Sequence, residues 1–379
     1  LPTEWSPEKN VAWRTELPGS AGSTPVVWGD HIFLTSVDTE NEDLLLICLG
    51  TDGKELWRQK LGNGAIDARG DEGNAAAPSP STDGEHVWAF FGNGVIGCFD
   101  FDGKEIWRRD LQEEFGKIQV GFVFSTTPLL VGDRIFMQMI SDGGHHVFAI
   151  DKLAGKTLWK HERESDAVAE CRHAYSSPVY YDDGKLQLLV THGADYTIAY
   201  DPADGKEIWR CGGLHPARGY DRTLRFVSSP AVGPGIIISP SAKRGPTLAI
   251  NPDSHGDITD TDAILWRYDA TPDVPSPLVH DGLVYICREN GVLVCLDAKT
   301  GEVCYEESVY RDRYRASPIC ADGKIYVTSR DGKVTVVKTG RTFELIAENE
   351  LGEPMAASPV VANGRIYLRT FNALWAIGE

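Results

Sequence analysis

The stretch SPVYYDDGKLQLLVTHGADYTIAYDPADGKEIW, residues 177–209, decides the fold. It opens on Ser177-Pro178, turns at Asp183-Gly184-Lys185, ends a strand at Ala199-Tyr200-Asp201 and closes on Asp204-Gly205-Lys206-Glu207-Ile208-Trp209. Related stretches follow one another about every 40 to 55 residues. Because a repeat of this period that is rich in short strands forms a radial or stacked array, it predicts the architecture before any functional site is considered.

Eight repeats can be counted from the proline that opens each of them. The openings are Pro25, Pro80, Pro128, Pro178, Pro230, Pro277, Pro318 and Pro359. The aromatic residue that closes the repeats is found at Trp57, Trp107, Trp159, Trp209, Trp266 and Tyr305, while the seventh repeat ends weakly near Phe343-Glu344-Leu345. The eighth repeat stops at Glu379, one strand short.

The missing strand is present at the other end of the chain. Asn10-Val11-Ala12-Trp13 has the pattern of a final strand. Since an open sheet edge is an aggregation hazard, we expect this segment to complete the C-terminal blade. The sequence therefore predicts one all-β domain over residues 1–379, an eight-bladed β-propeller of four-stranded antiparallel blades with its termini close together.

The composition limits the classes of partner. The formal net charge is −18 and the pI is about 5.0, which argues against nucleic acid as a ligand, because nucleic-acid binding needs a basic surface. No apolar run is long enough to predict a transmembrane segment. No signal peptide is visible, and the abrupt opening at Leu1 fits a leader or tether that has been removed. We expect a monomer.

The eight cysteines read mostly as core residues. Cys48, Cys98 and Cys295 occupy a repeat position that holds alanine in other repeats, so each is expected to be a small buried hydrophobe. Cys171 and Cys211 flank the fourth blade, and a disulfide between them stays open at this point. The chain contains no Cys-x-x-Cys pair of the kind that binds metals.

The repeat resembles that of the PQQ-binding-like β-propeller family. The resemblance is carried by Ala149-Ile150-Asp151 with Gly155-Lys156-Thr157-Leu158-Trp159, by the stretch that ends at Trp209, and by Cys295-Leu296-Asp297 with Thr300-Gly301-Glu302. It extends over nearly the whole chain. The family includes quinoprotein alcohol dehydrogenases and an outer-membrane assembly factor that works as a binding scaffold. The resemblance implies a propeller and an exported protein, periplasmic or secreted.

The sequence departs from the quinoprotein dehydrogenases of that family. Those enzymes use a vicinal Cys-Cys pair beside the quinone, and this chain has none. They also carry long insertions. The resemblance therefore implies the propeller without PQQ, and no cofactor is assigned other than a candidate divalent metal.

Basic residues gather in the loops expected on one face of the ring. In a propeller, the loops from the outermost strand to the next innermost strand lie on the same face as the loops between the second and third strands, and function usually resides on such loops. The basic residues of these loops are Arg218, Arg222, Arg225, Lys243, Arg244, Arg288, Arg311, Arg313, Arg315, Arg330 and Arg369.

Two interpretations of this basic cluster stay open. Arginine pairs bidentately with carboxylate, sulfate and phosphate, so the cluster could form a funnel for an acidic sugar, a polysaccharide or an acidic peptide. Alternatively, the arginines form local ion pairs with Asp221, Glu289, Asp312 and Asp331 at the blade junctions.

Histidines form a second candidate site. His145, His173 and His192, with Glu170, Asp195 and His215 in the same loops, could converge on one rim and bind a divalent metal through imidazole nitrogens. If the chemistry were proton abstraction from a uronate, His173 or Tyr175 would be the base and Arg172 or Arg225 the carboxylate clamp.

The leading functional hypothesis is an exported binding or scaffold protein for an anionic ligand or a protein partner. The second is a lyase or hydrolase that acts on an acidic polysaccharide. The third, disfavoured by the missing cysteine pair, is a quinone-dependent oxidoreductase.

Overall fold

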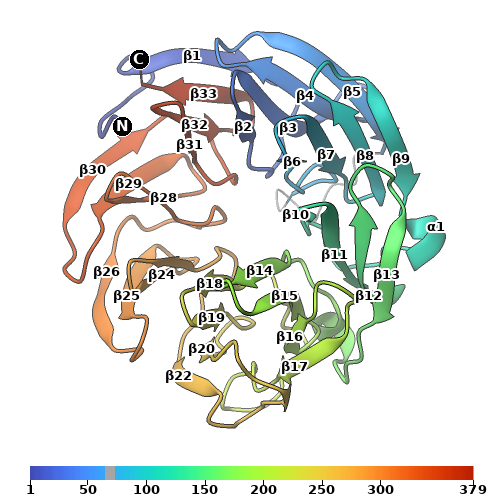
Figure 1. Cartoon of the computed structure of the whole chain (residues 1–379). Helices are drawn as coiled ribbons and strands as arrows, with labels where there is room; N and C mark the ends of the chain where they lie inside the picture. The colour runs from blue at the N-terminus through green and yellow to red at the C-terminus, as the bar shows by residue number, and fades with distance from the viewer. Residues whose placement is uncertain (65–72, 379) are drawn as a thin grey trace.

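The protein is a closed ring of eight β-sheets (Figure 1). The structure is a computed structural model, and it describes residues 1–64 and 73–378. Seven sheets have four strands, and the sheet of blade 4 has a fifth. The four repeat strands of each sheet form an antiparallel meander whose short first strand lies nearest the centre of the ring. The fold predicted from the repeat is confirmed.

The first half of the ring follows the sequence strand by strand. Blade 1 consists of β2 (Val26–Trp28), β3 (His31–Asp38), β4 (Asp43–Gly50) and β5 (Glu55–Asn63). Blade 2 consists of β6 (Ser81–Thr82), β7 (His86–Phe90), β8 (Val95–Asp100) and β9 (Glu105–Asp110). Blade 3 consists of β10 (Leu129–Val131), β11 (Arg134–Ser141), β12 (Gly144–Asp151) and β13 (Thr157–Glu162).

Blade 4 is the blade with an added strand. It consists of β14 (Val179–Asp182), β15 (Gln187–Gly193), β16 (Tyr196–Tyr200), β17 (Glu207–Cys211) and β21 (Gly256–Asp257). The last of these is contributed by the following repeat and pairs in parallel with β17. The repeat pattern did not predict this pairing.

The second half completes the ring. Blade 5 consists of β18 (Ala231–Gly233), β19 (Ile236–Ser239), β20 (Thr247–Ile250) and β22 (Ile264–Tyr268). Blade 6 consists of β23 (Leu278–His280), β24 (Leu283–Cys287), β25 (Val292–Asp297) and β26 (Val303–Ser308). Blade 7 consists of β27 (Ile319–Ala321), β28 (Lys324–Thr328), β29 (Lys333–Lys338) and β30 (Leu345–Glu350).

Blade 8 joins the two ends of the chain. It consists of β31 (Val360–Ala362), β32 (Arg365–Arg369), β33 (Ala373–Ile377) and β1 (Val11–Glu16). The N-terminal strand β1 pairs antiparallel with β33 and forms the outermost strand. The backbone N–H of Gly378 donates to the carbonyl oxygen of Asn10 at 2.9 Å, so the two termini lie side by side. The predicted closure by the N-terminal strand is confirmed.

The described helices are both short. The α-helix α1 (Gln112–Phe115) follows blade 2, and the 3₁₀ helix η1 (Ala169–Arg172) precedes blade 4. Within the described part of the chain, no helix has the length and apolar character needed to cross a membrane.

The tryptophans that close the first five repeats connect neighbouring blades. The indole N–H of Trp57 donates to the carbonyl oxygen of Phe101 at 2.7 Å, and the ring packs against Gly103 in the same turn of the next blade. Trp107, Trp159, Trp209 and Trp266 donate in the same way to carbonyl oxygens of the blade that follows each of them. The repeat therefore pairs Gly with Trp because the turn of one blade receives the indole of the previous one.

The residue before each opening proline forms an inner ring of hydrogen bonds. At every blade junction, the backbone N–H of this residue donates to the hydroxyl of its counterpart in the next blade, at 2.8 to 3.3 Å. The eight residues, in order around the ring, are Thr24, Ser79, Thr127, Ser177, Ser229, Ser276, Ser317 and Ser358. The Ser/Thr-Pro motif thus ties the innermost strands into a closed circle.

The core is distributed between the blades. The buried apolar side chains of the described residues form eight clusters, and each cluster is shared by neighbouring blades. Cys48, Cys98 and Cys295 are fully buried in such clusters, as expected. Cys171 and Cys211 are also buried, and neither forms a disulfide.

Candidate functional site

Two adjoining hollows form a cavity at the axis of the ring, which we call the axial cavity. Their volumes are about 350 and 480 Å³, and both are lined by Gly73, Ala77, Ser125, Val227, Val274 and Arg315. Every loop that leads from an outermost strand into the next innermost strand contributes at least one lining residue. The axial cavity therefore lies on the face of the ring where the sequence analysis predicted the candidate site.

Four cationic side chains line the axial cavity among the described residues. They are Arg225, Lys243, Arg315 and Arg330. Two of them lie over aromatic rings, since the guanidinium carbon of Arg225 is 4.1 Å from the ring centre of Phe122 and that of Arg330 is 4.0 Å from the ring centre of Phe371. Such cation–π contacts hold the guanidinium planes in place.

Acidic side chains lie beside three of these cations, Arg225, Lys243 and Arg315. Arg225 pairs with Glu170 at 3.0 Å, and Arg315 lies 3.7 Å from Glu289. Lys243 pairs with Glu289 and lies 3.4 Å from a carboxylate oxygen of Asp273. The expected ion pairing of the basic cluster is therefore present for part of it.

Asp273 and Glu289 form a close carboxyl pair at the cavity wall. Burial, together with the neighbouring Glu289, raises the pKa of Asp273 to about 6. Glu289 takes the negative charge of the pair, because Lys243 and Arg315 stand beside it, and its pKa is lowered. Near neutral pH, the described lining residues therefore carry more positive than negative charge.

A smaller hollow of about 310 Å³ adjoins the axial cavity between blades 5 and 6. It shares Lys243, Asp273 and Glu289 with the cavity and is also lined by Arg244 and Arg288. Arg288 pairs with Glu306 at 3.2 Å. These two arginines therefore belong to the rim of the same basic region.

The remaining predicted arginines are more scattered. Arg218 and Arg222 are exposed on the loop before β18, and Arg313 is exposed on the loop before β27. Arg369 is 1% exposed and donates to the carbonyl oxygen and hydroxyl of Ser23. Burial lowers the pKa of Arg369 to about 9. Because it is buried at the junction of blades 8 and 1, Arg369 has a structural position and does not line the cavity.

The candidate catalytic residues come together only in part. Tyr175 and Arg225 both line the axial cavity. The Tyr175 hydroxyl accepts a hydrogen bond from the backbone N–H of Phe122 at 3.2 Å, and burial raises its pKa. His173 is buried beside the cavity wall, where its Nε2 is 3.1 Å from Asp142, and Arg172 pairs with the same carboxylate at 3.6 Å. Tyr175 is therefore not a base near neutral pH.

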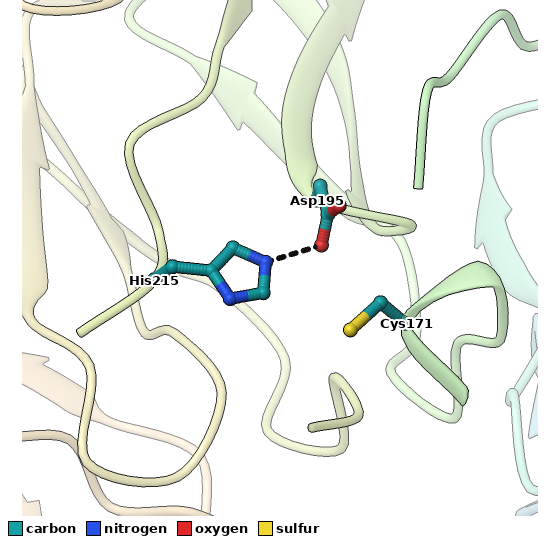
Figure 2. Close-up of side chains that lie close together, drawn as sticks. All are labelled: Cys171, Asp195 and His215. Atoms are coloured by element: carbon teal, nitrogen blue, oxygen red, sulfur yellow. Dashed lines mark hydrogen bonds and ion pairs between the residues drawn. The ribbon is translucent and has the colours of Figure 1, made fainter. Parts of the chain in front are cut away.

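The three histidines predicted to hold a metal do not converge. His192 lies on strand β15 rather than in a loop, fully buried, with Nδ1 2.8 Å from the Thr197 hydroxyl. Burial lowers the pKa of His192 to about 3 and that of His145, on β12, to about 4. Among the described residues, the group whose ligand atoms do approach one another is instead Cys171, Asp195 and His215 (Figure 2).

Sequence reasoning missed several of these residues. Asp273 was not among the expected site residues, although its loop is equivalent to the loop that carries Arg225. The aromatic rings of Phe122 and Phe371 were missed because apolar loop residues were not considered. Cys171 was treated as a core or disulfide residue. Aligning the eight loops by repeat position is the signal that would have found Asp273.

Comparisons with known proteins agree with the architecture. Among solved structures, BamB from Moraxella catarrhalis is 14% identical, with a TM-score of 0.67 over 96% of each chain. Quinohemoprotein alcohol dehydrogenase from Comamonas testosteroni is 12% identical, with a TM-score of 0.71 over 97% of this chain and 76% of that chain. A europium-containing methanol dehydrogenase is 13% identical, with a TM-score of 0.70 over 96% of this chain and 85% of that chain.

At these identities the structural likenesses show a shared fold. No curated protein sequence matches the chain. The family described as outer membrane protein assembly factor BamB matches residues 42–257 and 254–343, which is most of the chain. The chain therefore belongs to the BamB family of PQQ-like β-propellers.

Proposed function

We propose that this protein is an exported binding protein that captures a carboxylate-bearing ligand in the axial cavity. One observation carries the proposal. The chain has a net charge of −18, yet the described residues of the cavity include four cations and only two acids, one of which has a raised pKa. A local excess of positive charge in an acidic protein concentrates and orients anions.

The lining chemistry suits carboxylates. Arg225 and Arg330 each lie over an aromatic ring, and a guanidinium held over a ring presents N–H donors that suit a carboxylate. Lys243 adds a point charge where the axial cavity meets the smaller hollow at its rim, because it lines both. The acidic partners of Arg225 and Lys243 position the two cations, which reduces the entropy lost when a ligand binds.

The size of the cavity limits the ligand. The two hollows of about 350 and 480 Å³ fall within the range of small-molecule sites, roughly 300 to 1,000 Å³. An acidic oligosaccharide of a few units fits this volume, and so does a short acidic segment of a protein partner. The family name refers to an assembly factor, and a scaffold that holds such a segment agrees with that kind of role.

An enzymatic role is the second candidate, favoured by the presence of Tyr175 and Arg225 on the same wall. With Tyr175 as the base, this role requires loss of the phenolic proton, and the raised pKa of Tyr175 opposes that step. Binding without turnover is therefore the function that the geometry supports best.

The test is a calorimetric titration of the full chain with three probes of equal length. The probes are hexagalacturonate, maltohexaose and a hexaglutamate peptide. The proposal expects the carboxylate probes to bind and the neutral maltohexaose not to bind, with affinity that falls as salt is added. Tighter binding of hexagalacturonate would indicate that the ligand's carboxylates belong to a sugar, and tighter binding of the hexaglutamate peptide would indicate that they belong to a protein segment. Equal binding of the neutral and acidic sugars would overturn the proposal.

A further inference from the structure

Three side chains of types that can ligate a metal converge around blade 4, each from a different segment. Cys171 lies on η1 before blade 4, Asp195 lies in the turn between β15 and β16, and His215 lies in the loop after β17. One ligand atom of each lies within 4.8 Å of the other two. Figure 2 shows the thiol, the carboxylate and the imidazole directed toward a common point.

The carboxylate is held firmly in this position. Ala194 and Asp195 form a two-residue hairpin turn with φ of 44° and 68°. The Ser165 hydroxyl donates to the carbonyl oxygen of Ala194 at 2.6 Å, which fixes the turn against the loop that carries Cys171. Cys171 is 0% and Asp195 is 7% exposed, so both donors are withdrawn from solvent.

The imidazole is held by two contacts. Nε2 of His215 is 2.7 Å from Oδ1 of Asp195, and the ring stacks on Tyr220 with ring centres 4.1 Å apart. The Tyr220 hydroxyl donates to the second carboxylate oxygen, Oδ2, at 2.7 Å. Tyr220 itself is 50% exposed, so the group lies directly beneath one solvent-facing side chain. An ion can therefore reach it through a local movement of that loop.

A nucleophilic role for the thiol does not fit this arrangement. The Cys171 Sγ donates to the carbonyl oxygen of Asp221 at 3.2 Å, and His215 directs its bonded nitrogen at Asp195 instead. Burial raises the pKa of the Cys171 thiol, which disfavours the nucleophilic thiolate form.

We infer that Cys171, Asp195 and His215 form a Zn²⁺ site, with Sγ, a carboxylate oxygen and Nε2 as ligands and a water or the Tyr220 oxygen in the fourth position. Thiolate, imidazole and carboxylate are the ligands that zinc prefers. At ordinary zinc–ligand lengths of about 2.0 to 2.3 Å, tetrahedral ligand atoms stand about 3.3 to 3.6 Å apart. The His215–Asp195 contact would open by about 0.6 to 0.9 Å and the sulfur would move in by at most about 1.5 Å.

Such an ion would connect three loops of neighbouring blades. Glu170, which pairs with Arg225 in the axial cavity, is adjacent to Cys171. Zinc binding would therefore stiffen one wall of the cavity without itself contacting a ligand there. The site stands on its own geometry and does not depend on the proposed function.

The experiment measures zinc binding by the full chain in the absence of any anionic probe. Protein stripped with a chelator is titrated with Zn²⁺ by calorimetry, and with Co²⁺ to look for the charge-transfer absorption of a cobalt–thiolate bond. The result expected is one ion per chain and a visible thiolate band. Since losing an outer-shell partner of a metal ligand costs 10- to 100-fold, losing the ligand itself in Cys171→Ala is expected to weaken binding by more than about 100-fold.

The matched control is Cys211→Ala, which removes another fully buried free thiol of the same core cluster. It is expected to bind zinc as the wild type does. Circular dichroism checks that each variant folds. If Cys171→Ala does not fold, Asp195→Asn provides a second variant that lacks a proposed ligand. Absence of stoichiometric binding, absence of the thiolate band, or equal binding by the Cys171 and Cys211 variants would each overturn the inference.

Discussion

The backbone N–H of Ser358 donates a hydrogen bond to the hydroxyl of Thr24, with the two atoms 3.3 Å apart. This contact joins the last repeat to the first and closes the inner ring that seven similar bonds form at the other junctions. The residues are 334 positions apart in the chain. The contact therefore stabilises the closed form of the propeller, in which the innermost strand of the last repeat lies beside that of the first.

Thr24→Val tests this closure. The substitution keeps the shape of the side chain but leaves the Ser358 N–H without its acceptor, so we expect a loss of about 1 to 2 kcal/mol in the free energy of unfolding. Denaturant unfolding measures it. Thr342→Val, at an exposed position, is the control and should change stability by less than about 0.5 kcal/mol. Equal effects of the two variants would contradict a role for the ring in stability.

Gly155→Ala tests the packing of tryptophan on the turn of the next blade. Gly155 has φ of 65°, and an added Cβ would lie 2.6 Å from the Trp107 ring. Gly282 has φ of 73°, and a Cβ added to Gly282 would lie in open space. Both alanine variants incur the cost of positive φ, but only Gly155→Ala is expected to incur about 1 to 3 kcal/mol more from overpacking. Thermal and denaturant unfolding of the pair separate the two costs. The same loss in both would mean that the indole contact contributes nothing.

The pH dependence of stability tests the carboxyl pair. The pKa of Asp273 is raised from 3.8 to about 6 in the folded protein, so between these values the folded state binds more protons than the unfolded state. The stabilising contribution of the protonated carboxyl is present below pH 3.8 and is lost as pH rises through about 6. The Asp273→Asn variant has no carboxyl to titrate at this position, so it does not lose stability in this way as pH rises.

We therefore expect Asp273→Asn to gain stability relative to the wild type between pH 4 and pH 7.5, by about 1 to 3 kcal/mol. Parallel denaturant titrations at the two pH values measure the difference. A stability difference between variant and wild type that stays constant with pH would show that the Asp273 pKa is close to its ordinary value.

Tyr175→Phe separates binding from catalysis. The Tyr175 hydroxyl accepts one hydrogen bond, from the Phe122 N–H, and its pKa is raised. For a binding protein we expect affinity for hexagalacturonate to change by less than about tenfold, which corresponds to one modest hydrogen bond. Release of unsaturated products from polygalacturonate by the wild type, lost in Tyr175→Phe, would support the lyase alternative instead.

Much of the fold was predictable because the repeat encodes contacts that recur at every junction. The Ser/Thr before each proline has the same partner at every junction, and the tryptophans that close the first five repeats all donate to a carbonyl oxygen of the next blade, so one copy predicts the others. Trp13 follows the rule, since its indole N–H donates to the carbonyl oxygen of Thr51 at 2.9 Å. The N-terminal strand could therefore be placed from its sequence.

The site was less predictable because its contacts do not repeat. Arg225 and Arg330 line the cavity, whereas Arg369, at the end of β32, is buried against Ser23. His192 was expected in a loop, but β15 extends to Gly193 and buries it. Loop length and strand ends differ from blade to blade, and these differences decide which side chains meet.

The central claim is that cations of the axial cavity bind a carboxylate ligand. The most direct test compares hexagalacturonate affinity of the wild type with that of the double variant Arg225→Gln, Lys243→Gln, by calorimetry at low salt. The control is Lys104→Gln, Lys206→Gln, which removes two exposed charges from turns on the opposite face. We predict that the cavity variant binds at least about tenfold more weakly, because hydrogen bonds to charged groups contribute about 1.5 to 3 kcal/mol each, while the control binds like the wild type. An equal change in both variants, or none in either, would contradict the account.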